Sequence, residues 1–230
     1  MRKYILIVCT IFVMTSYMSA QQYEPVTVKA GTKVISYFPP SKRYLYPNFT
    51  EGSVILDNGN SIPNMMNYNI LSGEMEFLKS KDTLFIGDKK NIKSIVIAQD
   101  TFFYYNGYME MIQNGKFKVY LRQTVELKDI QKEGAFGTIN RSSASESYGF
   151  VLSGNRSLDL TPTENIVLQR VSDYFFSLSG YDFIQFTRSN VMKSIPTKKD
   201  KIKNYLKTNS VNFNSKEDLL KFSVFLNSIL

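Results

Sequence analysis

Five aromatic residues crowd the middle of the chain, and they could stack against the face of a sugar ring. They are Phe102, Phe103, Tyr104, Tyr105 and Tyr108. Aromatic faces bind carbohydrate through apolar contact, and tyrosine hydroxyls add hydrogen bonds. Successive side chains of a strand point to opposite faces, so Phe103 and Tyr105 would share one face and Phe102 and Tyr104 the other. One face must be core. The opposite face is then a ligand platform, a protein contact or a surface buried beneath the C-terminal helices.

Two carboxylates, Glu74 and Glu76, alternate onto one strand face and could flank a glycosidic bond. Glycoside hydrolases use such a pair as acid and as nucleophile or base. The competing interpretation is a solvated strand face opposite Met75 and Phe77. We favour the solvated face, because no other acidic residue lies close by in the sequence.

Histidine is absent from the chain, and its absence removes whole reaction classes. Ser–His–Asp triads, Cys–His pairs and histidine zinc sites are excluded. The segment Asp57–Asn60 lacks the ligand spacing of a calcium loop and predicts a hairpin turn instead. Four serines have no base motif beside them and indicate a flexible polar loop: Ser142, Ser143, Ser145 and Ser147. We therefore expect no metal site, no cofactor and no enzymatic activity.

Positive charge is concentrated at the C-terminal end, where it could meet an anionic partner. The chain has 28 basic and 20 acidic residues, a formal net charge of +8. Residues 21–187 hold 17 of each, whereas residues 188–230 hold 9 basic and 3 acidic residues. Five lysines cluster on one short predicted helix: Lys198, Lys199, Lys201, Lys203 and Lys207.

A solvated helix face is the default interpretation of these lysines. The alternative is contact with lipid headgroups, lipopolysaccharide phosphates or an acidic protein surface. Nucleic acid is not an expected partner, because no recognisable binding motif is present.

The first twenty residues have the order of a secretory signal peptide. Arg2 and Lys3 precede an apolar run from Tyr4 to Met14, and the small residue Ala20 precedes two glutamines. The apolar run is too short for a membrane-spanning helix, which needs about 20 residues. Cleavage after Ala20 would remove Cys9, the only cysteine. We expect an exported chain, periplasmic, outer-membrane-associated or secreted, with no transmembrane segment after the leader.

A sheet must position most of these candidate residues. Asn58–Gly59, Asn106–Gly107 and Asn114–Gly115 are strong hairpin signals between short apolar runs. In 116–127, apolar residues at odd positions alternate with mainly polar ones, which predicts one buried and one wet face. The patterns predict strands at 26–29, 33–38, 53–57, 65–70, 74–78, 83–86, 93–98, 101–105, 108–112, 116–127 and 165–176.

Beyond residue 132 the pattern changes twice. Residues 133–160 are rich in Ser and Gly and predict a long loop around one short strand, Tyr148–Leu152. The last 43 residues then show helical periodicity. We expect helices at 186–194, from Thr197 to Asn209, and from Ser215 to the end. The last of these would bury a stripe against the sheet, formed by Leu219, Phe222, Leu226 and Ile229.

The expected fold is therefore α+β. An antiparallel β-meander, strongly curved or barrel-like, fills residues 21–187, after a signal peptide at 1–20. Two or three helices in the basic segment 188–230 pack on that sheet as part of the same domain.

Two blocks of sequence resemble uncharacterised exported proteins of Bacteroidota-type bacteria. The first comprises Gly52–Gly59 and Asn67–Phe77, and the second comprises Lys201–Lys207 and Lys216–Leu220. Their shared residues are mainly turn and packing residues. The resemblance implies an envelope setting and no established activity, and it assigns no functional residues.

The leading hypothesis is a non-catalytic envelope protein that binds another macromolecule or has a structural role. Its partner would be an envelope protein, an outer-membrane assembly or an anionic surface. The first alternative is a carbohydrate-binding accessory protein that uses Phe102–Tyr108. A carboxylate-dependent glycoside hydrolase is the weaker alternative.

Overall fold

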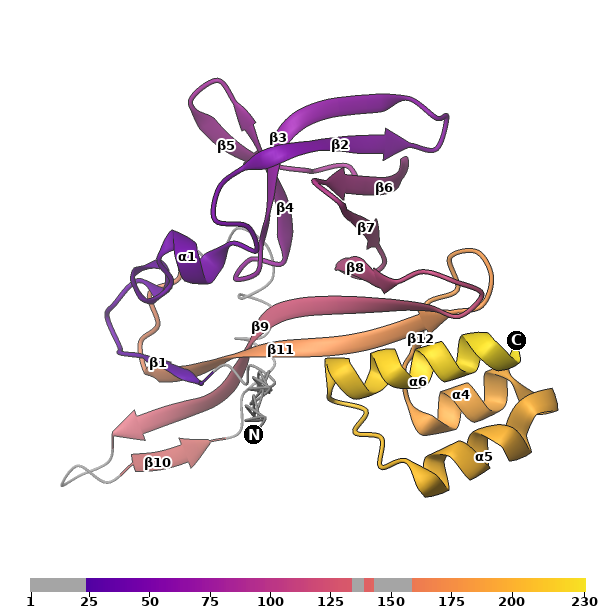
Figure 1. Cartoon of the computed structure of the whole chain (residues 1–230). Helices are drawn as coiled ribbons and strands as arrows, with labels where there is room; N and C mark the ends of the chain where they lie inside the picture. Colours follow the sequence, from indigo (N-terminus) through magenta and orange to yellow (C-terminus); the bar gives the residue numbers. More distant parts are fainter. Residues whose placement is uncertain (1–23, 134–138, 143–158) are drawn as a thin grey trace, which may run out of the picture.

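The computed structural model describes residues 24–133, 139–142 and 159–230, and their fold is α+β, as expected (Figure 1). The expected signal peptide and the strand expected at Tyr148–Leu152 lie outside these residues. The strands are β1 (Val26–Val28), β2 (Thr50–Leu56), β3 (Ser61–Asn69), β4 (Glu74–Lys79), β5 (Asp82–Phe85), β6 (Ile92–Ile97), β7 (Asp100–Tyr104), β8 (Tyr108–Gln113), β9 (Lys118–Glu133), β10 (Ile139–Ser142), β11 (Asn165–Ser177) and β12 (Ile184–Gln185). The helices are η1 (Val34–Tyr37), α1 (Pro40–Arg43), α4 (Arg188–Ser194), η3 (Pro196–Lys198), α5 (Lys199–Thr208) and α6 (Lys216–Ile229).

One antiparallel sheet, curved but not closed, contains all of these strands. Its order is β1-β11-β9-β8-β7-β6-β2-β3-β4-β5, with β10 paired to β9 and β12 paired to β11. Two meanders, β2–β5 and β6–β9, are therefore joined where β6 pairs with β2. The connection 86–91 brings the chain back from the sheet edge, and it is fixed at both ends: the amide of Ile86 donates to Met75, and that of Asp57 donates to Asn91.

Two of the expected Asn–Gly turns show why these residues are required. Gly59 has φ +86°, and the amide of Asn60 donates to the Asn58 side chain, which closes the β2–β3 hairpin. Asn106 and Gly107 both have positive φ, at +49° and +124°, in the β7–β8 hairpin. Two consecutive residues with positive φ match the twist of the flanking strands. The hairpin interpretation of Asp57–Asn60 is confirmed.

β9 and β11 form a long antiparallel ribbon that pairs with β1 and β10 and packs against the C-terminal helices. The predicted alternation in β9 is confirmed at Val119, Leu121 and Val125, which are buried. Tyr120, on the opposite face, is an exception: it is only 2% exposed rather than wet. The reason is a cover of other rings, because Phe183 and Phe103 pack edge-on against it with centroids 4.8 and 5.6 Å away.

Two local predictions are wrong. The segment 33–38 forms the helix η1 rather than a strand. Its buried residues are Val34 and Phe38, four apart, and this spacing suits a helical turn better than an alternating strand. In the expected loop, residues 139–142 form β10, because β9 runs on to Glu133 and gives them a strand to pair with.

The C-terminal helices follow the predicted pattern, with one shifted start. Ser215 caps α6 by accepting from the Asp218 amide, and Leu219, Phe222 and Leu226 are fully buried. α5 begins at Lys199 without a side-chain cap, because Pro196–Lys198 forms the separate turn η3. Thr187 caps α4 through the Asn190 amide.

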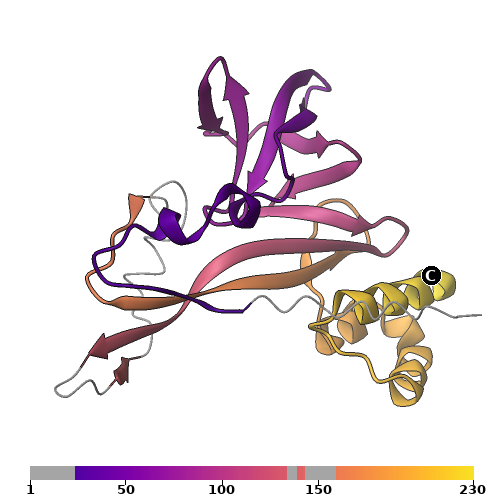
Figure 2. The same ribbon diagram turned by 60° about the vertical axis from the view of Figure 1, so that its left-hand side comes forward.

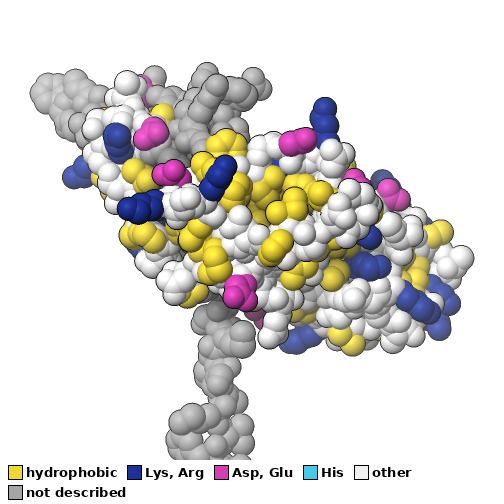
Figure 3. Space-filling model, turned by 90° about the horizontal axis from the view of Figure 1, so that it is seen from above, with side chains coloured by type: hydrophobic (Ala, Val, Ile, Leu, Met, Phe, Trp, Pro, Cys, Tyr) yellow, Lys and Arg dark blue, Asp and Glu magenta, His cyan; other side chains and the backbone are white. Residues whose placement is uncertain are grey.

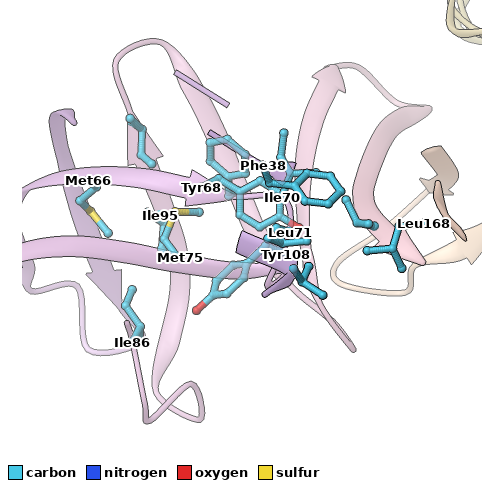
Figure 4. Close-up of a cluster of buried hydrophobic side chains, with 14 of the residues drawn as sticks. Phe38, Met66, Tyr68, Ile70, Leu71, Met75, Ile86, Ile95, Tyr108 and Leu168 are labelled. Carbon is cyan, nitrogen blue, oxygen red and sulfur yellow. The ribbon is translucent and has the colours of Figure 1, made fainter. Parts of the chain in front are cut away.

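Two large apolar clusters hold the molecule together. The sheet cluster lies inside the curve of the sheet. Tyr68 and Tyr108 lie close together near its centre, and Met66 lies toward one end (Figure 4). The helix cluster joins the β9–β11 ribbon to α4, α5 and α6 and includes Phe176 and Phe222. Figure 2 shows the hairpins standing on one side of the β9–β11 ribbon and the helices packed near one end of that ribbon. The basic segment therefore shares a core with the sheet.

Candidate binding surfaces

The sheet divides the aromatic run 102–108 between its two faces. Phe102 and Tyr108 are 2% and 1% exposed and belong to the sheet cluster, where both rings lie 6.2 Å from that of Tyr68. These two residues therefore act as core residues and cannot form part of a surface platform. Burial raises the pKa of the Tyr108 hydroxyl well above its usual value.

Tyr104 is 40% exposed, but its ring already has a cation above it. The Lys89 ammonium lies 4.9 Å from the Tyr104 centroid and 5.6 Å from that of Tyr108. The same ammonium lies 2.7 Å from a carboxylate oxygen of Glu74. Lys89 thus secures the returning connection 86–91 to three other strands, and we assign Tyr104 a structural role.

Phe103 and Tyr105 lie on the other face, where two later residues join them. We call Phe103, Tyr105, Tyr181 and Phe183 the outer aromatic surface. Phe183 lies 5.4 Å from Tyr105 and 6.1 Å from Phe103, between ring centroids, and Tyr181 lies 5.9 Å from Phe103. Tyr105 and Tyr181 are 45% and 54% exposed. The sequence did not indicate that Tyr181 and Phe183 belong here, because only the β9–β11 pairing brings them to β7.

Polar groups border the outer aromatic surface. The Arg122 guanidinium donates to Asp173 over 2.8 Å and to the backbone oxygen of Asn106 over 3.2 Å. It also lies 4.9 Å from the Phe175 ring centroid. Both charged side chains remain about a quarter exposed, at 24% and 27%. Hydrogen-bonding groups therefore stand beside exposed rings, as ligand sites require.

Neither Glu74 nor Glu76 lies on a solvated face, so that interpretation is wrong. Glu76 is 4% exposed and accepts hydrogen bonds from the Tyr44 hydroxyl and from the side-chain amide nitrogen of Asn69, each over 2.7 Å. The segment that contains Tyr44 covers the strand here. Burial and the neighbouring Glu76 raise the pKa of Tyr44 to about 12. Both carboxylates have structural partners, which weakens the case for a hydrolase pair.

Asp100 and Glu110 form a second acidic group, near Lys216 at the start of α6. Asp100 accepts a hydrogen bond from the Tyr46 hydroxyl over 2.6 Å. Burial raises the pKa of Glu110, the charge of Asp100 adds to the rise, and Lys216 at the start of α6 opposes it.

The raised pKa of Glu110 predicts a pH dependence of stability. The folded state binds the Glu110 proton more tightly than the unfolded chain does. The free energy of unfolding should therefore fall as the pH rises from the ordinary glutamate pKa through the raised one. Glu110→Gln should raise stability at neutral pH and remove this decline, measured by urea unfolding across that range. Glu126→Gln, at an exposed site on β9, is the control, and a less stable Glu110→Gln at neutral pH would contradict the assignment.

The lysines of the basic segment form a ridge on α5. Lys199, Lys203 and Lys207 recur every four residues and are all exposed, so they line one side of the helix. Lys201 is exposed elsewhere on α5, and Lys198 is half-buried just before it. The salt bridges of residues 24–133, 139–142 and 159–230 involve none of the five.

The apolar side of α5 faces inward. Ile202 is buried, and Tyr205 and Leu206 pack in the helix cluster. The Tyr205 ring stacks on Phe225 at a centroid distance of 4.2 Å. α5 therefore presents charge to the solvent without a large exposed apolar residue. Figure 3 shows Lys and Arg side chains at both ends of the molecule, several of them at the helical end.

A shallow groove of about 590 Å³ crosses the outer face of β2, β3 and β6. Both polar and apolar residues line this groove, and one of them, Glu51, has an ionisable side chain. Hydrophobic side chains gather on the face that Figure 3 shows. The groove has no set of groups that could perform acid–base chemistry.

Comparison with protein-family models, with curated proteins and with solved structures found no match to this chain. Among the helices that the structure describes, none has the length and apolar character to cross a membrane. In the same part of the chain, no three Asp, Glu, His or Cys side chains gather as a metal site would require.

Proposed function

We propose that the protein is an exported, non-catalytic binding module that attaches to an anionic lipid surface of the bacterial envelope through α5. Export is inferred from the signal-peptide pattern of residues 1–20. The observation that carries the proposal is the exposed ridge of Lys199, Lys203 and Lys207, which no salt bridge of the described chain neutralises.

The ridge has an energetic cost without a partner. Like charges four residues apart destabilise a helix by about 0.2–0.5 kcal/mol per pair, and two such pairs follow one another here. An anionic membrane surface offers about 1 kcal/mol for each nearby lysine. Three ridge lysines therefore contribute roughly 3 kcal/mol, which outweighs the internal repulsion. Because α5 has no exposed apolar residue to insert, the contact should be electrostatic and sensitive to salt.

The test is co-sedimentation of the purified chain with phospholipid vesicles. The triple variant Lys199→Gln, Lys203→Gln, Lys207→Gln should bind vesicles containing phosphatidylglycerol about a hundredfold more weakly than the original chain. The control removes three exposed lysines outside the segment, Lys42→Gln, Lys81→Gln and Lys93→Gln, and so makes the same change in net charge.

The control variant should bind nearly as well as the original chain. Equal losses in both variants would show that net charge alone matters and that α5 is not the contact. Binding to an acidic protein but not to the vesicles would replace the lipid surface with a protein partner.

A further inference from the structure

The outer aromatic surface has a rigid foundation. Tyr120 and Met109 are 2% and 0% exposed and pack with Phe103 and Phe183 of this surface, and Phe183 itself is only 9% exposed. The Tyr120 and Phe183 rings meet edge to face at 4.8 Å and 85°. Strands β7 and β9 and the turn before β12 hold the rings in place before any ligand arrives. A preorganised site loses little conformational entropy on binding.

Two tyrosines extend this foundation into the solvent. Tyr105 ends the β7 side of a positive-φ turn, where its amide donates to the Gly107 oxygen over 2.9 Å. Tyr181 precedes Phe183 in a turn closed by a 3.0 Å bond from the Phe183 amide to the Tyr181 oxygen. About half of each tyrosine is exposed, at 45% and 54%. Each offers an aromatic face and a hydroxyl to a ligand.

The neighbouring polar pair indicates the charge of that ligand. Arg122 and Asp173 form a salt bridge at 2.8 Å, so their charges largely offset each other. Arg122 also has more N–H donors than the two contacts with Asp173 and Asn106 occupy. A surface with apolar rings and polar groups, but little net charge, suits a neutral ligand with C–H faces and many hydroxyls.

The angles between the rings indicate the shape of that ligand. Tyr105 and Tyr181 are tilted against Phe183 by 41° and 51°, and Phe103 is tilted against Tyr181 by 53°. Phe103 and Tyr181, whose ring planes differ by 53°, cannot both lie flat against one crystalline face. Rings tilted in this way can contact successive sugar units that are rotated relative to one another along a soluble chain.

We propose that the outer aromatic surface binds a neutral oligosaccharide, which stacks on Tyr105 and Tyr181 and hydrogen-bonds to Arg122 and Asp173. This site is separate from the α5 ridge and is independent of the membrane attachment proposed above. It keeps only Phe103 and Tyr105 of the five residues in the original aromatic run and adds Tyr181 and Phe183.

Calorimetry and saturation-transfer NMR on the purified chain test the proposal with soluble oligomers of β-1,4-glucose, α-1,4-glucose and β-1,4-N-acetylglucosamine. At least one oligomer should bind saturably. The double variant Tyr105→Ala, Tyr181→Ala should weaken that binding by about a hundredfold, at about tenfold for each ring. Phe85→Ala is the matched control, because Phe85 is a 44% exposed aromatic residue on the distant strand β5.

Two further variants separate stacking from folding. Tyr105→Phe and Tyr181→Phe keep the rings and should retain most of the affinity, and circular dichroism should show that every variant is folded. The absence of binding by all three oligomers would overturn the proposal. Unchanged affinity in a folded double Ala variant, or binding only to crystalline cellulose or chitin, would overturn it too.

Discussion

Phe222→Ala should destabilise the protein by about 3–5 kcal/mol, a large share of the stability of an ordinary domain. Phe222 is fully buried at the centre of the helix cluster. Truncation removes contacts with four rings and leaves a cavity that the surrounding strands and helices cannot fill. The four ring centroids lie 5.4–6.3 Å away and belong to Phe186, Tyr205, Phe213 and Phe225.

The measurement is urea unfolding followed at once by far-ultraviolet and near-ultraviolet circular dichroism. The helix cluster includes Phe176 of β11 and Phe117, which directly precedes β9. The far-ultraviolet and near-ultraviolet signals should therefore change together in one transition. Val224→Ala is the control on the same helix: Val224 is 60% exposed, and its change should stay within about 0.5 kcal/mol. Loss of the helix signal while the sheet remains intact would show that α4–α6 fold as a separate unit.

Gly52→Ala is expected to have the second-largest effect, a destabilisation of about 3 kcal/mol. An added Cβ at Gly52 would lie 2.6 Å from the backbone oxygen of Val96, with Ile97 and Met66 at 3.2 and 3.3 Å. The clash falls between β2 and β6, the pairing that joins the two meanders. Because the nearest atom belongs to the backbone, relief requires the strands to separate.

Gly87→Ala supplies the comparison, because nothing lies within 4 Å of its added Cβ. This change should leave the urea midpoint almost unmoved. Gly52→Ala should lower the midpoint and weaken protection of the β2 and β6 amides in hydrogen exchange. Equal midpoints for the two variants would mean that the β2–β6 contact is looser than the structure shows.

Local periodicity predicted most of the elements, because each strand or helix carries its pattern within a few residues. The Asn58–Gly59 and Asn106–Gly107 turns and the stripe of α6 are examples. The error at residues 33–38 was local, because the spacing of Val34 and Phe38 suits a helical turn. Two other failures arose where a distant segment decides the outcome. Residues 139–142 became β10 because β9 continues to Glu133, and Glu76 was buried by the segment around Tyr44.

The candidate surfaces divide in the same way. The α5 ridge could be predicted, because the positions of Lys199, Lys203 and Lys207 within one helix determine their side. The aromatic site could not, because Tyr181 and Phe183 lie far from Tyr105 in the sequence. Alternation within β7 predicted two faces for the run 102–108, but only the packing of Phe102 and Tyr108 shows which face is core.

Attachment of the protein to an anionic envelope surface through the α5 ridge is tested most directly by salt release from isolated envelope membranes. The original chain and the Lys199, Lys203 and Lys207 triple variant are compared side by side as the salt concentration rises. The original chain should remain bound at low salt and be released as the Debye length falls toward about 3 Å, whereas the variant should be soluble from the start. A variant that stays bound at low salt as firmly as the original chain would contradict the claim.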